Sequence, residues 1–146
     1  MPPLRKIAVG FDGSVDARAA LHWALALAQQ VDCEVVVVHA VGLLEHGARQ
    51  PQADELGQAV RRLIADAAID AARVTWQLAD GDPCSVLIRA AAPPIGADLL
   101  VVGSRGQGAH AGHLLGSTSH ELAEHARVPL VIVPTPEGTS ARIDST

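Results

Sequence analysis

The sequence predicts an α/β protein in which a single doubly wound parallel five-stranded sheet forms one domain. Three observations lead to this fold class. Short β-branched runs alternate with Ala- and Leu-rich segments of helical periodicity, which indicates strand–helix–strand units with right-handed crossovers. The length of 146 residues suits one domain, and no repeat or compositional break divides it. Glycine-rich turns follow two of the strands, as expected where ligands meet the carboxyl end of a sheet.

The first half of the chain is predicted to form two strands and two helices. In order, these elements are a strand at 6–10, a helix at 15–30, a strand at 35–40, a polar loop at 42–52 and a helix through 56–67. The strands are assigned because their apolar residues are continuous and β-branched, which is typical of strands buried on both faces. The first helix is expected to follow an N-cap at Ser14, and both helices carry an apolar stripe at helical spacing.

The second half is predicted to add three strands and two helices. In order, these are a strand at 73–79, a helix from 83, a strand at 98–102, a long loop at 103–115, a helix at 117–126 and a strand at 129–134. Alternating apolar residues place the strand at 73–79 towards an edge of the sheet. Asp82 is the expected N-cap of the helix that follows, with Pro83 at its first position. Residues 135–146 are polar and are expected to form a loose tail beyond the domain at 1–134.

Composition excludes several classes of protein. The net charge is −5 and aromatic residues make up 2%, so the sequence lacks the basic face and stacking residues of a nucleic-acid-binding protein. No segment has the length and apolarity of a membrane span, and the N-terminus lacks the pattern of a signal peptide. Cys33 and Cys84 are far apart in the sequence, which favours a reducing compartment. We therefore expect a cytoplasmic protein.

Two glycine-bearing turns are expected to meet over one edge of the sheet. With the flavodoxin-like or Rossmann-like strand order 3-2-1-4-5, the order reverses between the first and fourth strands, where ligands bind in such sheets. The turns that leave these two strands span residues 10–14 and 103–116. Their glycines would let backbone N–H groups approach an anion, and the helix from Ser117 would add a favourable dipole. This convergence predicts a site for nucleotide phosphates.

In the second turn, a glycine, two residues, a second glycine, nine residues, and then glycine and serine occupy positions 103–117. This spacing resembles the ATP-binding signature of the universal stress protein family. The pieces at 9–14 and 128–133 also agree with the family pattern, so the resemblance covers 6–134 and points to the ATP-binding branch. The nucleotide contacts that it implies are Gly10, Phe11, Asp12, Ala40, Val102, Gly103, Arg105, Gly106, Gly116, Ser117 and Thr118.

The resemblance implies a nucleotide-dependent regulator or sensor of the stress response, with ATP as its ligand. Asp12 would lie near the ribose or a bridging Mg²⁺, and the backbone of Gly10 and Ala40 near the adenine. Hydrolysis is expected to be slow at most, because no lysine lies near the phosphate loop. An adenine-nucleotide hydrolase, a cyclic AMP-binding protein and a nucleotide-free interaction module remain as alternatives.

Other candidate residues have simpler structural interpretations. The histidines among residues 110–125 match no closed zinc site, so no metal site is predicted. No catalytic residue is assigned, since no His–Asp partner accompanies Ser117. His39 is expected to be a core histidine with its hydrogen bonds satisfied, and Cys84 a small, partly buried thiol. Asp12 has two interpretations, a turn former and a ligand contact, of which we favour the second.

The last predicted strand, at 129–134, would leave a long apolar edge if the sheet ended there. Such edges are usually covered, because they offer unpaired backbone groups to other chains. The family resemblance implies antiparallel pairing of this strand with its copy in a second subunit, which gives a homodimer.

Overall fold

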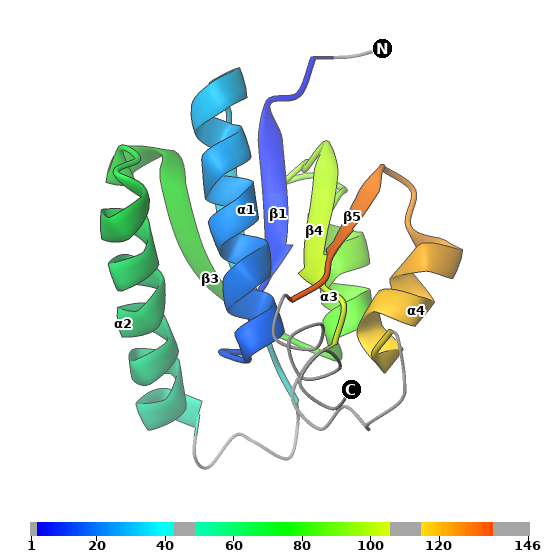
Figure 1. The fold of residues 1–146 in the computed structure, drawn as a ribbon. Helices are drawn as coiled ribbons and strands as arrows, with labels where there is room; N and C mark the ends of the chain where they lie inside the picture. The colour runs from blue at the N-terminus through cyan, green and yellow to red at the C-terminus, as the bar shows by residue number, and fades with distance from the viewer. Residues whose placement is uncertain (1–2, 43–48, 106–114, 136–146) are drawn as a thin grey trace, which may run out of the picture.

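A parallel sheet with helices on both faces makes up the described part of the chain, which comprises residues 3–42, 49–105 and 115–135 of the computed structural model (Figure 1). The strands are β1 (Lys6–Gly10), β2 (Glu34–Val41), β3 (Val74–Asp80), β4 (Leu99–Gly103) and β5 (Leu130–Val133). The helices are α1 (Val15–Val31), α2 (Arg49–Ala67), α3 (Pro83–Ala90) and α4 (Ser117–His125), with a short 3₁₀ turn, η2 (Ala71–Arg73), before β3. The strand order is β3-β2-β1-β4-β5 and all neighbours are parallel, which confirms the predicted fold.

Successive residues of the central strands pack on opposite faces of the sheet. Ile7 and Val9 of β1 belong to the core beneath α1 and α2, whereas Ala8 belongs to the core beneath α3 and α4. In β2 the four valines at 35–38 are at most 5% exposed, as predicted for a strand that is buried on both faces. Because β1 and β4 pair directly and run parallel, the two glycine-bearing turns leave adjacent strands at the carboxyl end of the sheet.

Some predicted boundaries differ from the structure. The helix α2 begins at Arg49, so the last part of the predicted loop at 42–52 is helical; Pro51 lies in its first turn, where a missing N–H breaks no helical hydrogen bond. Thr135 was expected in the loose tail, but it is buried. Residues 136–146 of that tail and residues 106–114 of the phosphate loop lie outside the described residues. Within the described ranges, no helix is long and apolar enough to cross a bilayer.

Candidate functional site

A pocket of about 770 Å³ opens at the carboxyl ends of β1, β2 and β4, where the strand order reverses. Ten of the eleven residues predicted as nucleotide contacts line this pocket, and the remaining one, Gly106, lies outside the described residues. The ten are Gly10, Phe11, Asp12, Ala40, Val102, Gly103, Arg105, Gly116, Ser117 and Thr118. The structure thus brings together the described residues of the two turns that are predicted to meet at one crevice.

The apolar end of the pocket is formed by β2 and α3. It comprises Val38, Ala40, Pro83, Val86 and Leu87, of which Val38, Val86 and Leu87 are at most 3% exposed. Sequence reasoning missed the contribution of α3. Since α3 follows β3 at the same edge of the sheet, the apolar spacing in its first two turns was the available signal.

The start of α3 is fixed by its N-cap, as the sequence predicts. The Asp82 carboxylate accepts a hydrogen bond from the Ser85 N–H at 3.1 Å, and Pro83 occupies the first turn. This hydrogen bond holds the pKa of Asp82 below its ordinary value, because it stabilises the charged form. The cap therefore sets where the wall of the apolar end begins.

The polar end of the pocket consists of Gly103, Arg105, Gly116, Ser117 and Thr118. The N-cap of α4 is Gly116, which has extended backbone and no side chain to cap the helix. The first-turn N–H groups of α4 therefore lack the side-chain acceptor that Ser14 supplies to α1. An uncapped N-terminus with hydroxyl residues in its first turn favours an anion.

Packing against helices accounts for two of the pocket glycines. A Cβ at Gly103 would lie 2.6 Å from the backbone of Asp16, so the first turn of α1 approaches β4 where no side chain fits. A Cβ at Gly10 would lie 2.8 Å from Leu87 Cδ1, the flexible tip of a side chain on α3. Sequence analysis assigned Gly103 to close approach by an anion and the backbone of Gly10 to the adenine. The structure adds the close approach of two helices as a further reason for glycine at both positions.

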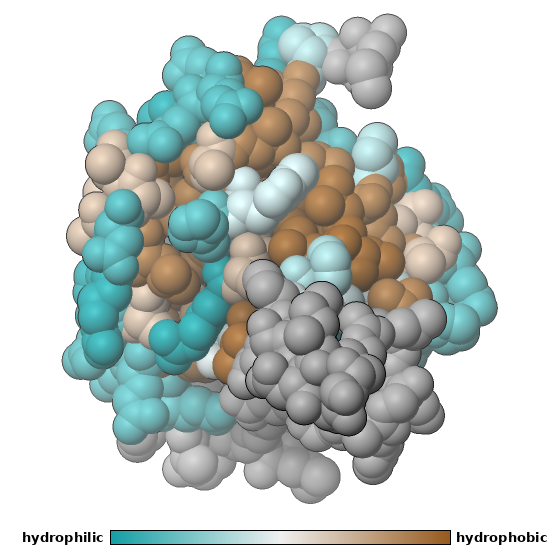
Figure 2. Space-filling view, in the orientation of Figure 1, coloured by the Kyte–Doolittle hydropathy of each residue, from teal (hydrophilic) through white to brown (hydrophobic). Residues whose placement is uncertain are grey.

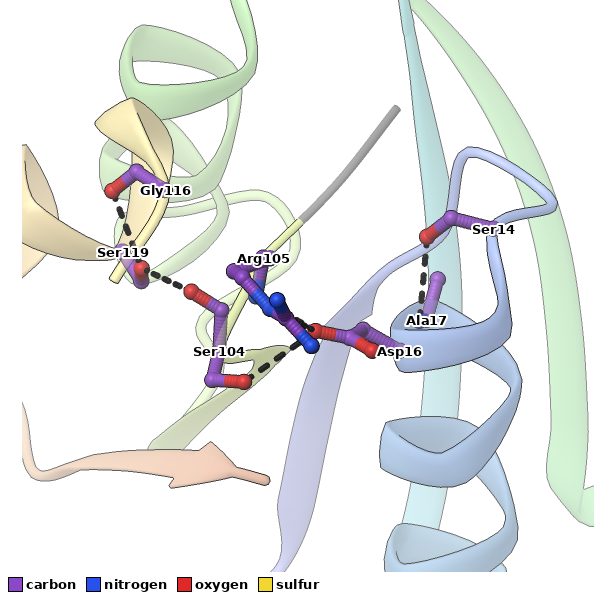
Figure 3. A network of polar contacts seen from close by, with 7 residues as sticks. All are labelled: Ser14, Asp16, Ala17, Ser104, Arg105, Gly116 and Ser119. Atoms are coloured by element: carbon purple, nitrogen blue, oxygen red, sulfur yellow. Dashed lines mark hydrogen bonds and ion pairs between the residues drawn. The ribbon is translucent and has the colours of Figure 1, made fainter. Parts of the chain in front are cut away.

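Ser104 forms hydrogen bonds with α1, β5 and the start of α4, a role that sequence analysis did not predict; Figure 3 shows its contacts with Asp16 and Ser119. Its N–H donates to Val133 O of β5 at 3.0 Å, and its hydroxyl donates to Asp16 Oδ2 of α1 at 3.1 Å. Its carbonyl accepts from Gly116 N at 2.7 Å and from Ser119 Oγ at 2.9 Å, both at the start of α4. Ser104 thereby fixes the position of α4 relative to the sheet.

Asp12 and His39 have structural roles as well as positions at the pocket. Asp12 Oδ1 accepts a hydrogen bond from Ser14 N at 2.9 Å, so Asp12 does form the turn before α1. His39 is 7% exposed, and its Nδ1 donates to the Phe11 carbonyl at 2.9 Å while its ring stacks on Trp76. The prediction of a satisfied core histidine is confirmed.

Cys84 lies behind the apolar end, next to Pro83. It is 5% exposed, Cys33 is 2% exposed, and neither forms a disulfide. Burial raises the pKa of the Cys84 thiol, and the nearby Glu121 carboxylate raises this pKa further. A raised pKa makes the thiol less reactive at neutral pH, so Cys84 behaves as a buried packing residue, more enclosed than the sequence suggested.

The sequence profile of the Universal stress protein family matches residues 3–134. The chain belongs to this family. A universal stress protein of Mycobacterium tuberculosis is 33% identical over 142 residues, covering 87% of this chain and 46% of the relative. A universal stress protein of Mycobacterium bovis is 28% identical over 153 residues, covering 88% and 47%. The chain spans about half the length of these curated relatives.

Solved structures share the fold of this universal stress protein. UspA from Lactobacillus plantarum has a TM-score of 0.78 at 20% identity and covers 91% of this chain and 99% of its own. A universal stress protein in complex with cAMP has a TM-score of 0.72 at 23% identity and covers 91% and 98%. One from Archaeoglobus fulgidus in complex with dAMP has a TM-score of 0.67 at 20% identity and covers 90% and 99%.

Proposed function

We propose that the pocket binds an adenine nucleotide, with ATP as the first candidate, and that the protein is a nucleotide-dependent regulator or sensor in the stress response. The observation that carries this proposal is the convergence of ten predicted contact residues on one pocket at the switch point of the sheet. Its volume of about 770 Å³ lies within the usual range for small-molecule sites. Hydrolysis is expected to be slow at most.

The division of the pocket supports this assignment. The apolar end suits a purine base, and the polar end offers backbone N–H groups and hydroxyls to phosphates. Asp12 also lines the pocket and is assigned to the ribose or a bridging Mg²⁺. Family members solved in complex with cAMP and with dAMP add support from outside this chain.

The direct test is to denature freshly purified protein and identify any released nucleotide by mass. We expect an adenine nucleotide, or, for protein purified empty, a rise in Tm on adding ATP with Mg²⁺. Protein that releases no nucleotide and whose Tm is unmoved by millimolar ATP, AMP or cyclic AMP would instead be a nucleotide-free interaction module. Rapid production of AMP and pyrophosphate from ATP would identify a hydrolase.

Cyclic AMP is a second candidate ligand, because the positive charge at the polar end is sparse. Among the described lining residues, Arg105 is the only Lys or Arg, and residues 106–114 add neither type. A monoanion needs less compensating charge than a triphosphate. Titration of cyclic AMP and ATP into the same protein at equal ionic strength distinguishes the two ligands by their Kd values.

We also propose that β5 pairs with its copy in a second subunit. The Pro129 carbonyl accepts a hydrogen bond from the N–H of Leu100 in β4, and the Val133 carbonyl accepts one from the N–H of Ser104, directly after β4. Because the backbone groups of successive strand residues point to alternate sides, those of Leu130 and Ile132 point away from β4. Figure 2 shows apolar surface over this side of the sheet, beside α1. Val131→Lys is expected to give monomers by light scattering, whereas Val15→Lys on the exposed start of α1 is expected to leave the dimer intact.

We assign the protein to the cytoplasm. Both cysteines are buried and unpaired, which agrees with a reducing compartment. Fractionation of cells that produce the full chain tests this assignment.

A further inference from the structure

Arg105 is the main source of positive charge for phosphates at the polar end. It is the only Lys or Arg among the described residues that line the pocket, and its side chain is 33% exposed. The chain's single lysine, Lys6, lies at the opposite end of β1. How far affinity increases with the number of phosphates therefore depends on whether the Arg105 guanidinium is free to bind them.

That guanidinium already has a partner, Asp16, which lies in the first turn of α1 (Figure 3). The Asp16 Oδ2 atom lies 3.5 Å from the side-chain Nε of Arg105. It also accepts a hydrogen bond from the backbone N–H of Arg105 at 2.8 Å. The same oxygen accepts from Ser104 Oγ at 3.1 Å. Asp16 is 7% exposed and is not among the described residues that line the pocket, so it acts on the site through its neighbours.

The backbone keeps the carboxylate in this position. Gly103 leaves no space between β4 and the first turn of α1, since an added Cβ would meet the Asp16 backbone at 2.6 Å. The helix dipole also favours a negative side chain in the first turn. The low exposure of Asp16 strengthens its interaction with Arg105, because water screens a buried pair less than an exposed one.

We propose that Asp16 is a specificity-determining residue that neutralises Arg105 and thereby limits the preference of the site for highly charged phosphates. This inference rests on the proposed adenine-nucleotide site. A polyphosphate meets a guanidinium whose charge Asp16 already offsets from its Nε side, whereas adenosine and a nucleotide with little phosphate charge do not depend on that charge. Affinity in the natural protein should therefore rise only slightly from adenosine through AMP to ATP.

The test is Asp16→Asn, with Kd values for adenosine, AMP and ATP measured by calorimetry at low and high salt. The amide oxygen retains an acceptor for Ser104 Oγ and the Arg105 N–H but removes the charge that pairs with the guanidinium. We expect ATP to bind about tenfold more tightly, AMP to gain less and adenosine to be unchanged, because a released guanidinium makes charge-assisted hydrogen bonds to phosphate. The gain should shrink at high salt.

The ratio of ATP affinity to adenosine affinity is the decisive quantity, since a merely structural role would weaken all three ligands together. Asp66→Asn, on the exposed part of α2, makes the same change in net charge away from the pocket and should leave the ratio unchanged. Arg105→Gln should lower ATP affinity by less than about threefold in the natural protein, where the charge is already neutralised. In the Asp16→Asn background it should remove the entire gain.

Two results would overturn the inference while leaving the proposed function intact: nucleotides bind but Asp16→Asn leaves the affinity ratio unchanged or lowers it, or Arg105→Gln alone weakens ATP more than about threefold. Absence of binding by adenosine and all the nucleotides to the natural protein would overturn the proposed function and this inference together. Circular dichroism and Tm establish that each variant is folded. If Asp16→Asn does not fold, the Arg105→Gln result in the natural protein decides.

Discussion

The apolar end and the polar end of the pocket are held in place by different interactions. At the apolar end, buried aliphatic side chains of β2 and α3 pack against each other, and the wall needs no hydrogen bond between distant side chains. At the polar end, Ser104 and Arg105 are held by Asp16, which is 88 and 89 positions earlier in the chain. Substitutions at the two ends should therefore have different effects on stability and on ligand discrimination.

The largest expected effect is on stability and distinguishes two pocket glycines, Gly103 and Gly10. Gly103→Ala forces a methyl group against the Asp16 backbone, which cannot rotate away, and should cost about 3 kcal/mol of unfolding free energy. Gly10→Ala meets only the tip of Leu87, which can change rotamer, and should cost about 1 kcal/mol. Urea unfolding of both variants measures the difference. Equal losses would show that the contact between α1 and β4 is no tighter than that between β1 and α3.

Gly116→Glu tests the polar end by placing a carboxylate at the start of α4. Repulsion between this group and phosphates should weaken ATP binding more than about 100-fold while adenosine loses much less. Gly42→Glu is the control with the same charge change, since a Cβ there meets nothing within 4 Å. A variant at 116 that binds ATP as well as the natural protein does would rule out the phosphate assignment.

Val86→Ala tests the apolar end. Loss of two buried methyl groups should cost about 1–2 kcal/mol of stability and weaken adenosine, AMP and ATP by a similar factor of about five. Val60→Ala, on the buried face of α2, should cost similar stability without changing any Kd, because Val60 is 1% exposed and does not line the pocket. Calorimetric titrations decide; a loss that grows with phosphate number would mean that the base does not occupy this end.

The smallest expected effect concerns the pH dependence of stability through Cys84. The folded state raises the pKa of this thiol above its ordinary value of 9.0, mainly by burial, whereas the unfolded chain ionises near that value. The unfolded state then binds fewer protons above pH 9, so stability should fall as pH rises through this range. Cys84→Ala should show a shallower fall between pH 8 and pH 10 in denaturant titrations. An identical slope would mean that Cys84 does not titrate differently on folding.

Much of the fold could be predicted from local patterns. The four valines at 35–38 identify a strand buried on both faces, and the alternation at 73–79 correctly indicates an edge strand. The caps at Ser14 and Asp82 mark the starts of α1 and α3, because each needs only a hydrogen bond within the next three residues. The start of α2 was predicted too late, since Pro51 and the surrounding polar residues are typical of both loops and first helical turns.

Only the site residues that directly follow the ends of strands could be predicted from the sequence. Residues after β1 and β4 lie at the switch point whatever their side chains contact, so the described parts of the glycine-bearing turns lie where the sequence predicts them. Asp16 could not be found in this way, because an acidic residue in a first helical turn is expected for the helix dipole alone. Its contacts with Ser104 and Arg105 depend on how closely α1 approaches β4, which is a tertiary property.

Trp76 provides an optical signal from the pocket without a dye. Its indole ring stacks on the His39 imidazole, with centroids 6.3 Å apart and planes at 17°, and Phe11 meets it edge-on. His39 and Phe11 both line the pocket, so a base bound as proposed would change the surroundings of this fluorophore. Because the chain has only two tryptophans, Trp23→Phe leaves a single emitter whose intensity follows occupancy directly.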